Sequence, residues 1–307
     1  MEITVDLIRA IREKTGAGMT DCKKALVESG GNFDEAVDWL RKKGLAAAAQ
    51  KASRVAADGL IGIANDGYNA AAVVEINTET DFVAKNQKFQ DFAHKIASIC
   101  VTESCTTIDQ LLHKTINDVH IHDYINDLIA VIGENIAIRR IARISVDNGI
   151  VASYIHNTVA PGLGKIGVLV GIESTADVQK LTDFGKKLAM HIAASSPKYL
   201  DIASVPNDEV EHEKSILLEQ IKPSDKPADI INKMIEGRIR KFYEEVVLAE
   251  QVYVIDGKKK ITTIVNDFGK EINASVKICT FEKFVLGEGL ERPDTDFASE
   301  VLSLAGK

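Results

Sequence analysis

The 307-residue sequence is poor in cysteine, has fewer basic than acidic residues, and contains no long apolar run. Its cysteines are Cys22, Cys100, Cys105 and Cys279, and no Cys-x-x-Cys pair supports a zinc-ribbon or thioredoxin-like site. We expect buried free thiols in a reducing compartment. No apolar stretch is long enough to cross a bilayer, and the first residues lack the features of a signal peptide. We therefore expect a cytoplasmic protein without a membrane partner.

Acidic residues outnumber basic ones, which gives a net charge of −8. A protein that binds nucleic acid through its phosphates needs a basic surface, so we expect no direct nucleic-acid partner. The composition, with 45% hydrophobic and 27% charged residues, is that of an ordinary globular protein. The length suffices for two or three domains, each with its own core.

Signatures of catalysis are also missing. In the glycine-rich segment Gly162–Gly167, Ile166 occupies the place of the Ser or Thr that binds Mg²⁺ in a phosphate-binding loop, so we expect an ordinary loop between strands. His120 and His122 lie two positions apart on a predicted helix and face different sides, so we expect both to be exposed. With no nucleophile–base pair, metal cluster or cofactor fingerprint, we expect a binding protein and no enzyme.

Residues 1–55 show the apolar spacing of three short helices with glycine turns between them. Thr20 is a candidate cap for the second helix, and Asn32, followed by Glu35, for the third. Gly44 is expected to end the third helix, and the alanine-rich residues 46–57 are expected to form a connecting helix. The pattern resembles a small ubiquitin-associated-type bundle.

From about residue 56 a repeat emerges, in which two strands are followed by a helix and a later β-rich segment. The segments of the first copy are Asp58–Ile61, Ala72–Ile76, Phe92–Ala97 and Ile136–Val146, and those of the second are Asn148–Val151, Lys165–Val170, Leu188–Ala193 and Ser275–Val285. The offset is 90 residues at the first glycine and 96 at the helix, with an insertion around Thr158–Gly164. The sequence predicts an α+β fold with two duplicated β-β-α-β subdomains.

The predicted organisation has five parts. They are the bundle at 1–55, the first core subdomain at 56–146, the second at 147–203 and 250–286, a helical arm at 204–249 and a C-terminal module at 287–307. The arm is expected to be an antiparallel hairpin, because two apolar-patterned helices flank the turn Lys222–Pro227. The C-terminal module is expected to end in a helix.

The stretch Thr78–Asn86 connects a predicted buried strand to a predicted amphipathic helix, and Phe82 follows neither pattern. Two interpretations compete. Phe82 is either a loop residue that folds back as a plug or a projecting aromatic anchor for a protein partner. The tripeptide Thr-Asp-Phe recurs at Phe184 and Phe297, where it opens amphipathic patterns, so those two phenylalanines are expected in the core.

Two long motifs resemble those of bacterial translation elongation factor Ts. The first is Ile11–Leu26 (IREKTGAGMTDCKKAL), and the second is Glu75–Lys85 (EINTETDFVAK). Shorter matches are Ile132–Ile136, Glu236–Arg238 and Thr295–Ala298. The resemblance covers essentially the whole chain in order. The insertion at Asn157–Gly164 departs from the shortest members of the family.

The resemblance implies a guanine-nucleotide exchange factor that binds elongation factor Tu with GDP, displaces Mg²⁺ and GDP, and allows GTP to reload during translation elongation. It implies no cofactor, and it places Thr80, Asp81, Phe82 and Val83 against the GTPase domain of elongation factor Tu, where they would dislocate Mg²⁺.

It further implies that Arg12 and Met19 contact the same domain and that His156 faces the partner's distal domain. An accessory role of the arm, including homodimerisation, stays open. The alternative is an adaptor that holds a protein partner through the helical bundle without changing its nucleotide state.

Overall fold

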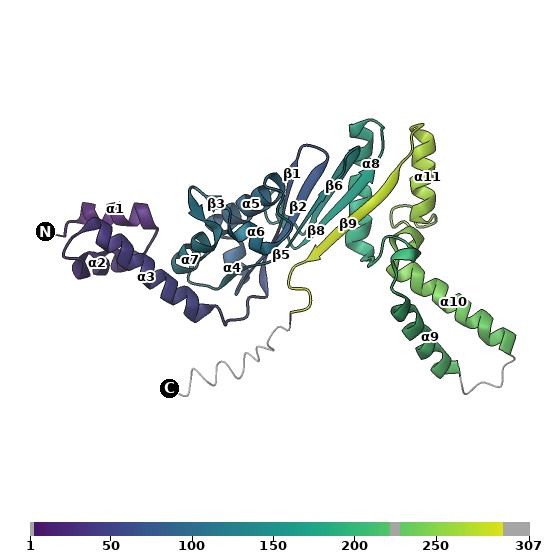
Figure 1. Cartoon of the computed structure of the whole chain (residues 1–307), viewed down its shortest axis with the longest axis horizontal. Coiled ribbons are helices and arrows are strands. Elements are labelled where there is room, and N and C mark those ends of the chain that lie inside the picture. Colours follow the sequence, from purple (N-terminus) through teal and green to yellow (C-terminus); the bar gives the residue numbers. More distant parts are fainter. Residues whose placement is uncertain (1–2, 222–227, 291–307) are drawn as a thin grey trace.

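The computed structural model describes residues 3–221 and 228–290. Figure 1 shows an elongated arrangement, with a helical bundle at one end, two sheets in the middle and two long helices projecting at the other end. N-terminal helices are followed by antiparallel sheets that carry helices. The predicted α+β fold is thereby confirmed.

The N-terminal bundle consists of α1 (Val5–Thr15), α2 (Met19–Glu28) and α3 (Phe33–Lys51). Gly16 ends α1 with a φ of 70°, a conformation that suits glycine. The core of the bundle is made of small and aliphatic side chains, which are Ile8, Ile11, Cys22, Ala25, Leu26, Ala36 and Leu40. Asn32 caps α3, as predicted, by accepting from the backbone of Asp34 and Glu35. The predicted cap at Thr20 is wrong, because α2 begins at Met19 with Gly18 as its N-cap, two residues before Thr20.

The expected end of α3 at Gly44 is also wrong, because α3 continues to Lys51. Of the expected connecting helix at 46–57, residues 46–51 form the last part of α3, and residues 52–57 are not helical. Gly44 is buried against α7 (Ile121–Ile132), and a Cβ at this position would lie only 3.2 Å from the Cβ of Ala130. The glycine therefore lets two helices approach closely instead of ending one of them.

The first sheet has the order β5-β2-β1-β7, and the second has the order β6-β8-β9. The strands of the first sheet are β1 (Asp58–Asp66), β2 (Ala70–Thr78), β5 (Ile136–Ser145) and β7 (Leu163–Gly164). Those of the second sheet are β6 (Gly149–His156), β8 (Ile166–Glu173) and β9 (Lys277–Val285). All their pairings are antiparallel, and in each half the second strand, β2 or β8, lies between the first and the last.

Irregularities of the two sheets also repeat. The register of β2 shifts between Glu75 and Ile76, and that of β8 shifts 96 residues later, between Gly171 and Ile172. Gly59 and Gly149 have φ values of 131° and 140°, and a side chain on either would collide with the backbone carbonyl of the neighbouring middle strand. The repeated glycine is therefore required by the close approach of two strands.

The insertion after β6 is not the plain loop that its glycines predict. Leu163 and Gly164 form β7, which pairs with Ile61 and Gly62 at the edge of the first sheet. Lys165 then donates to the Asp58 carboxylate at 2.6 Å. The insertion thus joins the second half of the repeat to the first.

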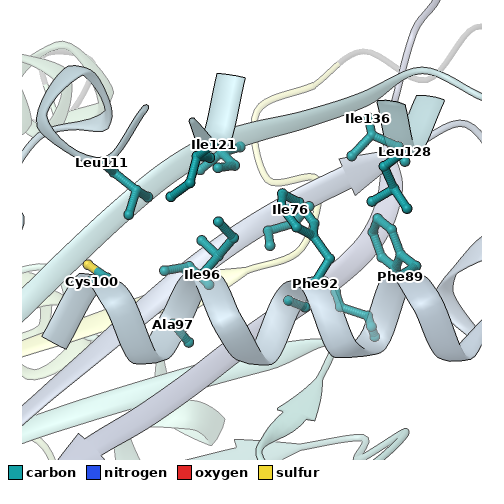
Figure 2. Packing of buried hydrophobic residues seen from close by; sticks show 14 of the residues in the cluster. Ile76, Phe89, Phe92, Ile96, Ala97, Cys100, Leu111, Ile121, Leu128 and Ile136 are labelled. Atoms are coloured by element: carbon teal, nitrogen blue, oxygen red, sulfur yellow. The ribbon is translucent and has the colours of Figure 1, made fainter. Parts of the chain in front are cut away.

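The two sheets pack face to face through Ile61, Ile63, Ala71, Val73, Ile144, Val151, Leu169 and Phe284. Helix α5 (Gln87–Thr102) covers the outer face of the first sheet, and α8 (Val178–Ser195) covers that of the second. Figure 2 shows Phe89, Phe92 and Ile96 of α5 among the side chains of Ile76 and Ile121. Every residue of β2 is buried, because this strand has a packed layer on each face.

The arm consists of α9 (Asn207–Ile221) and α10 (Ala228–Val246), which lie side by side (Figure 1). The shorter elements are α4 (Asp81–Ala84), α6 (Ile108–Leu112), β3 (Thr115–Ile116), β4 (Val119–His120), η1 (Ile202–Ser204), η2 (Leu248–Glu250) and α11 (Ile261–Glu271). Phe184 is buried within α8 and stacks on Phe268 of α11 with ring centroids 4.1 Å apart. The turn of the arm, Phe297 and the expected C-terminal helix lie outside the described residues.

Candidate partner-binding site

The connection between β2 and α5 contains a single helical turn, α4. Asn86 separates α4 from α5 and caps α5 by accepting a hydrogen bond from the backbone N–H of Lys88. Val83 and Ala84 are buried in the core under the first sheet, whereas Asp81 and Lys85 are exposed. The turn is therefore fixed by one face and presents the other to solvent.

Phe82 lies on that outward face and is 77% exposed. The Lys85 ammonium lies 5.7 Å from the centre of the Phe82 ring and 3.0 Å from the Asp81 carboxylate. Lys85 therefore contacts both the aromatic ring and the Asp81 carboxylate on the surface. The interpretation of Phe82 as a plug is wrong, since its side chain projects away from the core.

The remaining predicted residues of this turn have different environments. Val83 is only 7% exposed and holds α4 on the core. Thr80 precedes α4 and is half-buried, and both its backbone N–H and its hydroxyl donate to the Glu134 carboxylate, at 2.9 and 2.6 Å. Of the predicted residues of this turn, Asp81 and Phe82 are the exposed ones.

A reciprocal pair of carboxylates fixes the start of the connection. Glu134 accepts from Thr80 and from the hydroxyl of Thr78 at 2.9 Å. Glu79 in turn accepts from the backbone N–H of Asn135 at 2.6 Å. We call this arrangement of residues 78–80 and 134–135 the carboxylate clasp. Glu134 and Asn135 stand out in the sequence only within the family match at 132–136, because a contact across 54 residues leaves no local pattern.

The clasp also reaches the segment that leads from the bundle to the first sheet. Arg54 lies 3.4 Å from the Glu79 carboxylate, and the Asn135 side chain donates to the Arg54 carbonyl at 2.9 Å. The segments that follow the bundle and α7 are thus both bonded to the connection that carries Phe82.

Arg12 and Met19 are both exposed and line one shallow hollow together with Lys88 from the first turn of α5. Met19 is 38% exposed. The structure therefore brings the two predicted bundle residues next to the helix that follows Phe82.

A second groove, of about 410 Å³, runs between the bundle and α7, where it is lined by Leu40, Gly44 and Asp127 among others. Burial raises the pKa of Asp127, and the positive charge of Arg41 opposes that shift.

His156 stands apart from these residues. It is exposed at the end of β6, and its Nδ1 lies 3.0 Å from the hydroxyl of Tyr154. Its neighbour across the sheet is Ile166, so its described contacts belong to the second half of the repeat. A partner that touches both Phe82 and His156 has to extend across the two halves.

The described residues offer little for covalent chemistry. Within residues 3–221 and 228–290, no group of three or more His, Cys, Asp or Glu side chains is arranged to hold a metal ion. Burial raises the pKa of all four thiols, that of Cys100 to about 12, so the reactive thiolate form is disfavoured. His120 and His122 are exposed, as predicted, although His120 precedes α7.

None of the helices in the described part of the chain is long and apolar enough to span a bilayer. An exposed aromatic on a fixed turn, with further exposed groups nearby, suits recognition of another macromolecule.

Known proteins resemble this chain over nearly its whole length. The family model described as Elongation factor TS matches residues 79–288. The chain is 51% identical over 307 residues to Elongation factor Ts of Paramagnetospirillum magneticum, which covers 99% of this chain and 98% of the relative. The chain belongs to the elongation factor Ts family. Identity to the Elongation factor Ts of Rhodospirillum centenum is 50%, with 99% of each chain covered, and to that of Gluconobacter oxydans 48%, also with 99% of each.

Membership in the elongation factor Ts family confirms the resemblance carried by residues 11–26 and 75–85, and it makes the chain a translation elongation factor. The family match begins at Glu79, inside the carboxylate clasp, and includes α4 and His156. The relatives also align with the N-terminal bundle, because they cover nearly all of this chain.

Proposed function

We propose that this protein is a guanine-nucleotide exchange factor for elongation factor Tu. It binds the GDP-bound partner, displaces Mg²⁺ and GDP, and leaves a nucleotide-free complex that GTP can reload. The observation that carries the proposal is the 77% exposure of Phe82 on a turn whose other face is buried. A side chain held in this way loses little conformational freedom on binding, so more of its burial energy is available for the complex.

In this proposal the two binding surfaces have different tasks. Arg12 and Met19 hold the GTPase domain, and Phe82 enters it, with Asp81 as its polar companion and with Thr80 and Val83 fixing the turn. Insertion of Phe82 shifts the groups that hold Mg²⁺ and phosphate. His156 faces the partner's distal domain, across the second half of the repeat.

Exchange follows from linkage between two ligands of one partner. If the factor binds nucleotide-free elongation factor Tu more tightly than the GDP complex, GDP affinity falls by the same ratio when the factor is bound. No bond in the factor has to form or break. The direction of exchange is then set by the cellular excess of GTP, and the factor itself needs neither a catalytic group nor a cofactor.

The arm offers a further surface. Its distal part exposes Ile216, Leu218, Ile230 and Met234, which are between 37% and 47% exposed. Exposed apolar side chains on a projecting hairpin favour a protein contact, and we propose an accessory contact with a second copy of the chain.

The proposal is tested by the release of a fluorescent GDP analogue from purified elongation factor Tu, chased with excess unlabelled GDP. We expect the factor to accelerate release and excess Mg²⁺ to oppose the acceleration. Binding without acceleration would instead favour the adaptor that holds its partner through the bundle. Absence of both binding and acceleration would contradict both functions.

A further inference from the structure

The turn that carries Phe82 is too short to be stable by itself. Helix α4 has four residues, and a helical turn fixes several backbone angles for very few hydrogen bonds. The last paired residues of the neighbouring strands are Thr78 and Ile136, so no ladder hydrogen bond supports the chain beyond them. The orientation of Phe82 therefore depends on the buried face of α4, which is Val83 and Ala84, and on the contacts that hold residues 79 and 80 at its start.

Glu134 supplies that support with both oxygens of its carboxylate. One oxygen accepts from the Thr80 hydroxyl at 2.6 Å, and the other accepts from the Thr80 backbone N–H and the Thr78 hydroxyl, each at 2.9 Å. Hydrogen bonds to an ionised acceptor are shorter and stronger than neutral ones. The Thr80 side chain makes no cap hydrogen bond to α4, so its hydroxyl is committed to Glu134.

Because Glu134 comes just after α7 in the chain, these bonds also connect α7 to the turn. Gly133 ends α7 in the left-handed conformation, with a φ of 91°, and Glu134 follows it directly. Helix α7 also packs against the bundle, through the close contact of Gly44 with Ala130. One carboxylate thus connects the helix that receives the bundle to the turn that presents Phe82.

We propose that Glu134 is a positioning residue, which holds α4 so that Phe82 points outward before the partner arrives. This inference rests on the proposed exchange function and names the group that orients its central side chain. Loss of the carboxylate leaves Phe82 present but lets α4 sample other orientations. The step that follows first contact, in which Phe82 enters the partner, should then become slower.

The experiment compares Glu134→Ala and Glu134→Gln with the wild-type chain. The glutamine variant retains one oxygen for two of the donors, and its NH₂ group can donate to the Thr80 hydroxyl, which also accepts. We therefore expect Gln to rescue most of what Ala loses. Glu103→Ala is the matched control, because Glu103 is an exposed carboxylate that pairs with Lys114 at 3.1 Å, away from the clasp.

Two readouts separate positioning from folding and from the function itself. In the free chain, hydrogen exchange of the Thr80 amide should become about tenfold faster in Glu134→Ala, as expected when a local opening becomes easier. With elongation factor Tu, the maximal rate of GDP release at saturating factor should fall about tenfold or more. The factor concentration for half-maximal release should change little, because the bundle contacts are intact.

Unchanged Thr80 exchange in Glu134→Ala would overturn the inference. So would faster exchange with an unchanged maximal release rate, or equal defects in the Gln and Ala variants. If the wild-type chain does not accelerate GDP release from elongation factor Tu, the proposed function fails, and the positioning role for exchange fails with it. The amide measurement on the free chain would then still report whether Glu134 holds the turn.

Discussion

Phe82 and Val178 occupy equivalent positions in the two halves of the repeat, 96 residues apart, yet they lie in opposite environments. Phe82 is exposed on α4, whereas Val178 packs against the core under the second sheet at the start of α8. The two halves have the same strand order and the same strand irregularities. The difference is therefore specific to the connection and is not a property of the shared fold.

A local cause is visible in the helices. In the first half, Asn86 caps α5 and separates it from α4. In the second half, the equivalent Thr182 lies inside α8, where its hydroxyl donates to the carbonyl of Val178 at 2.8 Å. A continuous helix keeps Val178 on its buried side. The interrupted one turns Phe82 outward.

A leucine at Gly44 should weaken the seating of the bundle. A Cβ there already lies 3.2 Å from Ala130, so a branched side chain has to push α3 away from α7. In Gly44→Leu we expect a higher factor concentration for half-maximal GDP release, with the maximal rate largely kept. Helical content by circular dichroism should stay near that of the wild type. Gly237→Leu is the control, since nothing lies within 4 Å of that position.

Loss of the Glu75 carboxylate should strongly destabilise the fold. Glu75 is fully buried and pairs with Arg139 at 3.0 Å and with Arg140, and it accepts from the backbone of Gly287 at 2.9 Å. Burial alone would raise the pKa of Glu75, but the bonds from Gly287 and the two arginines outweigh it and lower that pKa.

Breaking one partner of a buried ion pair typically costs about 3–5 kcal/mol, and we expect Glu75→Ala to lose a comparable free energy of unfolding in urea. Asp267→Ala removes an exposed carboxylate that pairs with Lys259, and it should cost far less, because solvent screens that pair. If both variants lose a similar free energy of unfolding, the buried cluster around Glu75 stabilises the fold no more than an exposed ion pair does.

Acid should loosen the contact between α8 and the base of the arm through His191. This side chain is fully buried, its Nε2 lies 3.0 Å from the Gln251 side-chain oxygen, and its Nδ1 accepts from the backbone of Val254. Burial lowers the pKa of His191 below 6.5, although the Gln251 bond opposes that shift. As the pH falls below about 6.5, His191 is protonated in the unfolded chain more readily than in the folded chain. The free energy of unfolding therefore decreases over this range.

The stability of wild type and His191→Gln, compared between pH 7.5 and 5.5, isolates this effect. Burial raises the pKa of Asp127 and Glu282, so these carboxylates titrate in the opposite sense, but they do so in both proteins. We expect the wild type to lose more free energy of unfolding than the variant over this range. Parallel pH profiles would assign the acid sensitivity to other groups.

The repeat was predictable because its signals are local. Glycines at 59 and 149 and the apolar pattern of each strand and helix recur at a nearly constant offset, and the packing that they imply is the one found. Phe82 was identifiable as an exception to both patterns. Its exposure, however, depends on Asn86 and on the burial of Val83, which periodicity alone does not decide.

Other features depend on contacts between distant parts of the chain. Gly44 has the sequence context of a helix end, but its role is set by Ala130, which no local pattern connects to it. The bonds of Glu134 to Thr80 span 54 residues, and β7 pairs with a strand about 100 residues before it. Tertiary packing outweighs local preference at such sites.

Shortening the arm should leave the two sheets intact. The base of the arm is held by Val205, Val210 and Val247 with neighbouring aromatic side chains, so we propose to replace only residues 214–239 by a short glycine–serine linker. The melting temperature should change little, and GDP release should be reduced at most modestly. If the arm mediates homodimerisation, sedimentation should show a dimer that is lost in the variant. Complete loss of release by the folded variant would instead make the arm central to exchange.

Phe82→Ala should slow GDP release while leaving the free protein as stable as the wild type. The ring is largely exposed, so truncation removes little buried surface and leaves no cavity. Burial of a phenylalanine in a partner contributes about 1.5–3 kcal/mol, which is tenfold or more in an equilibrium constant. Residual binding should persist through Arg12 and Met19. Asp81→Ala should have a smaller effect, because Asp81 is solvated and already paired with Lys85.

Phe184→Ala is the matched control for the loss of a phenylalanine. Phe184 is 8% exposed and stacked on Phe268, so its truncation should lower the melting temperature without a selective defect in GDP release by the folded fraction. Melting curves and stopped-flow release on the wild type and the three variants distinguish the roles. A Phe82→Ala protein that melts several degrees lower and exchanges normally when folded would show that the ring supports the fold and does not act on the partner.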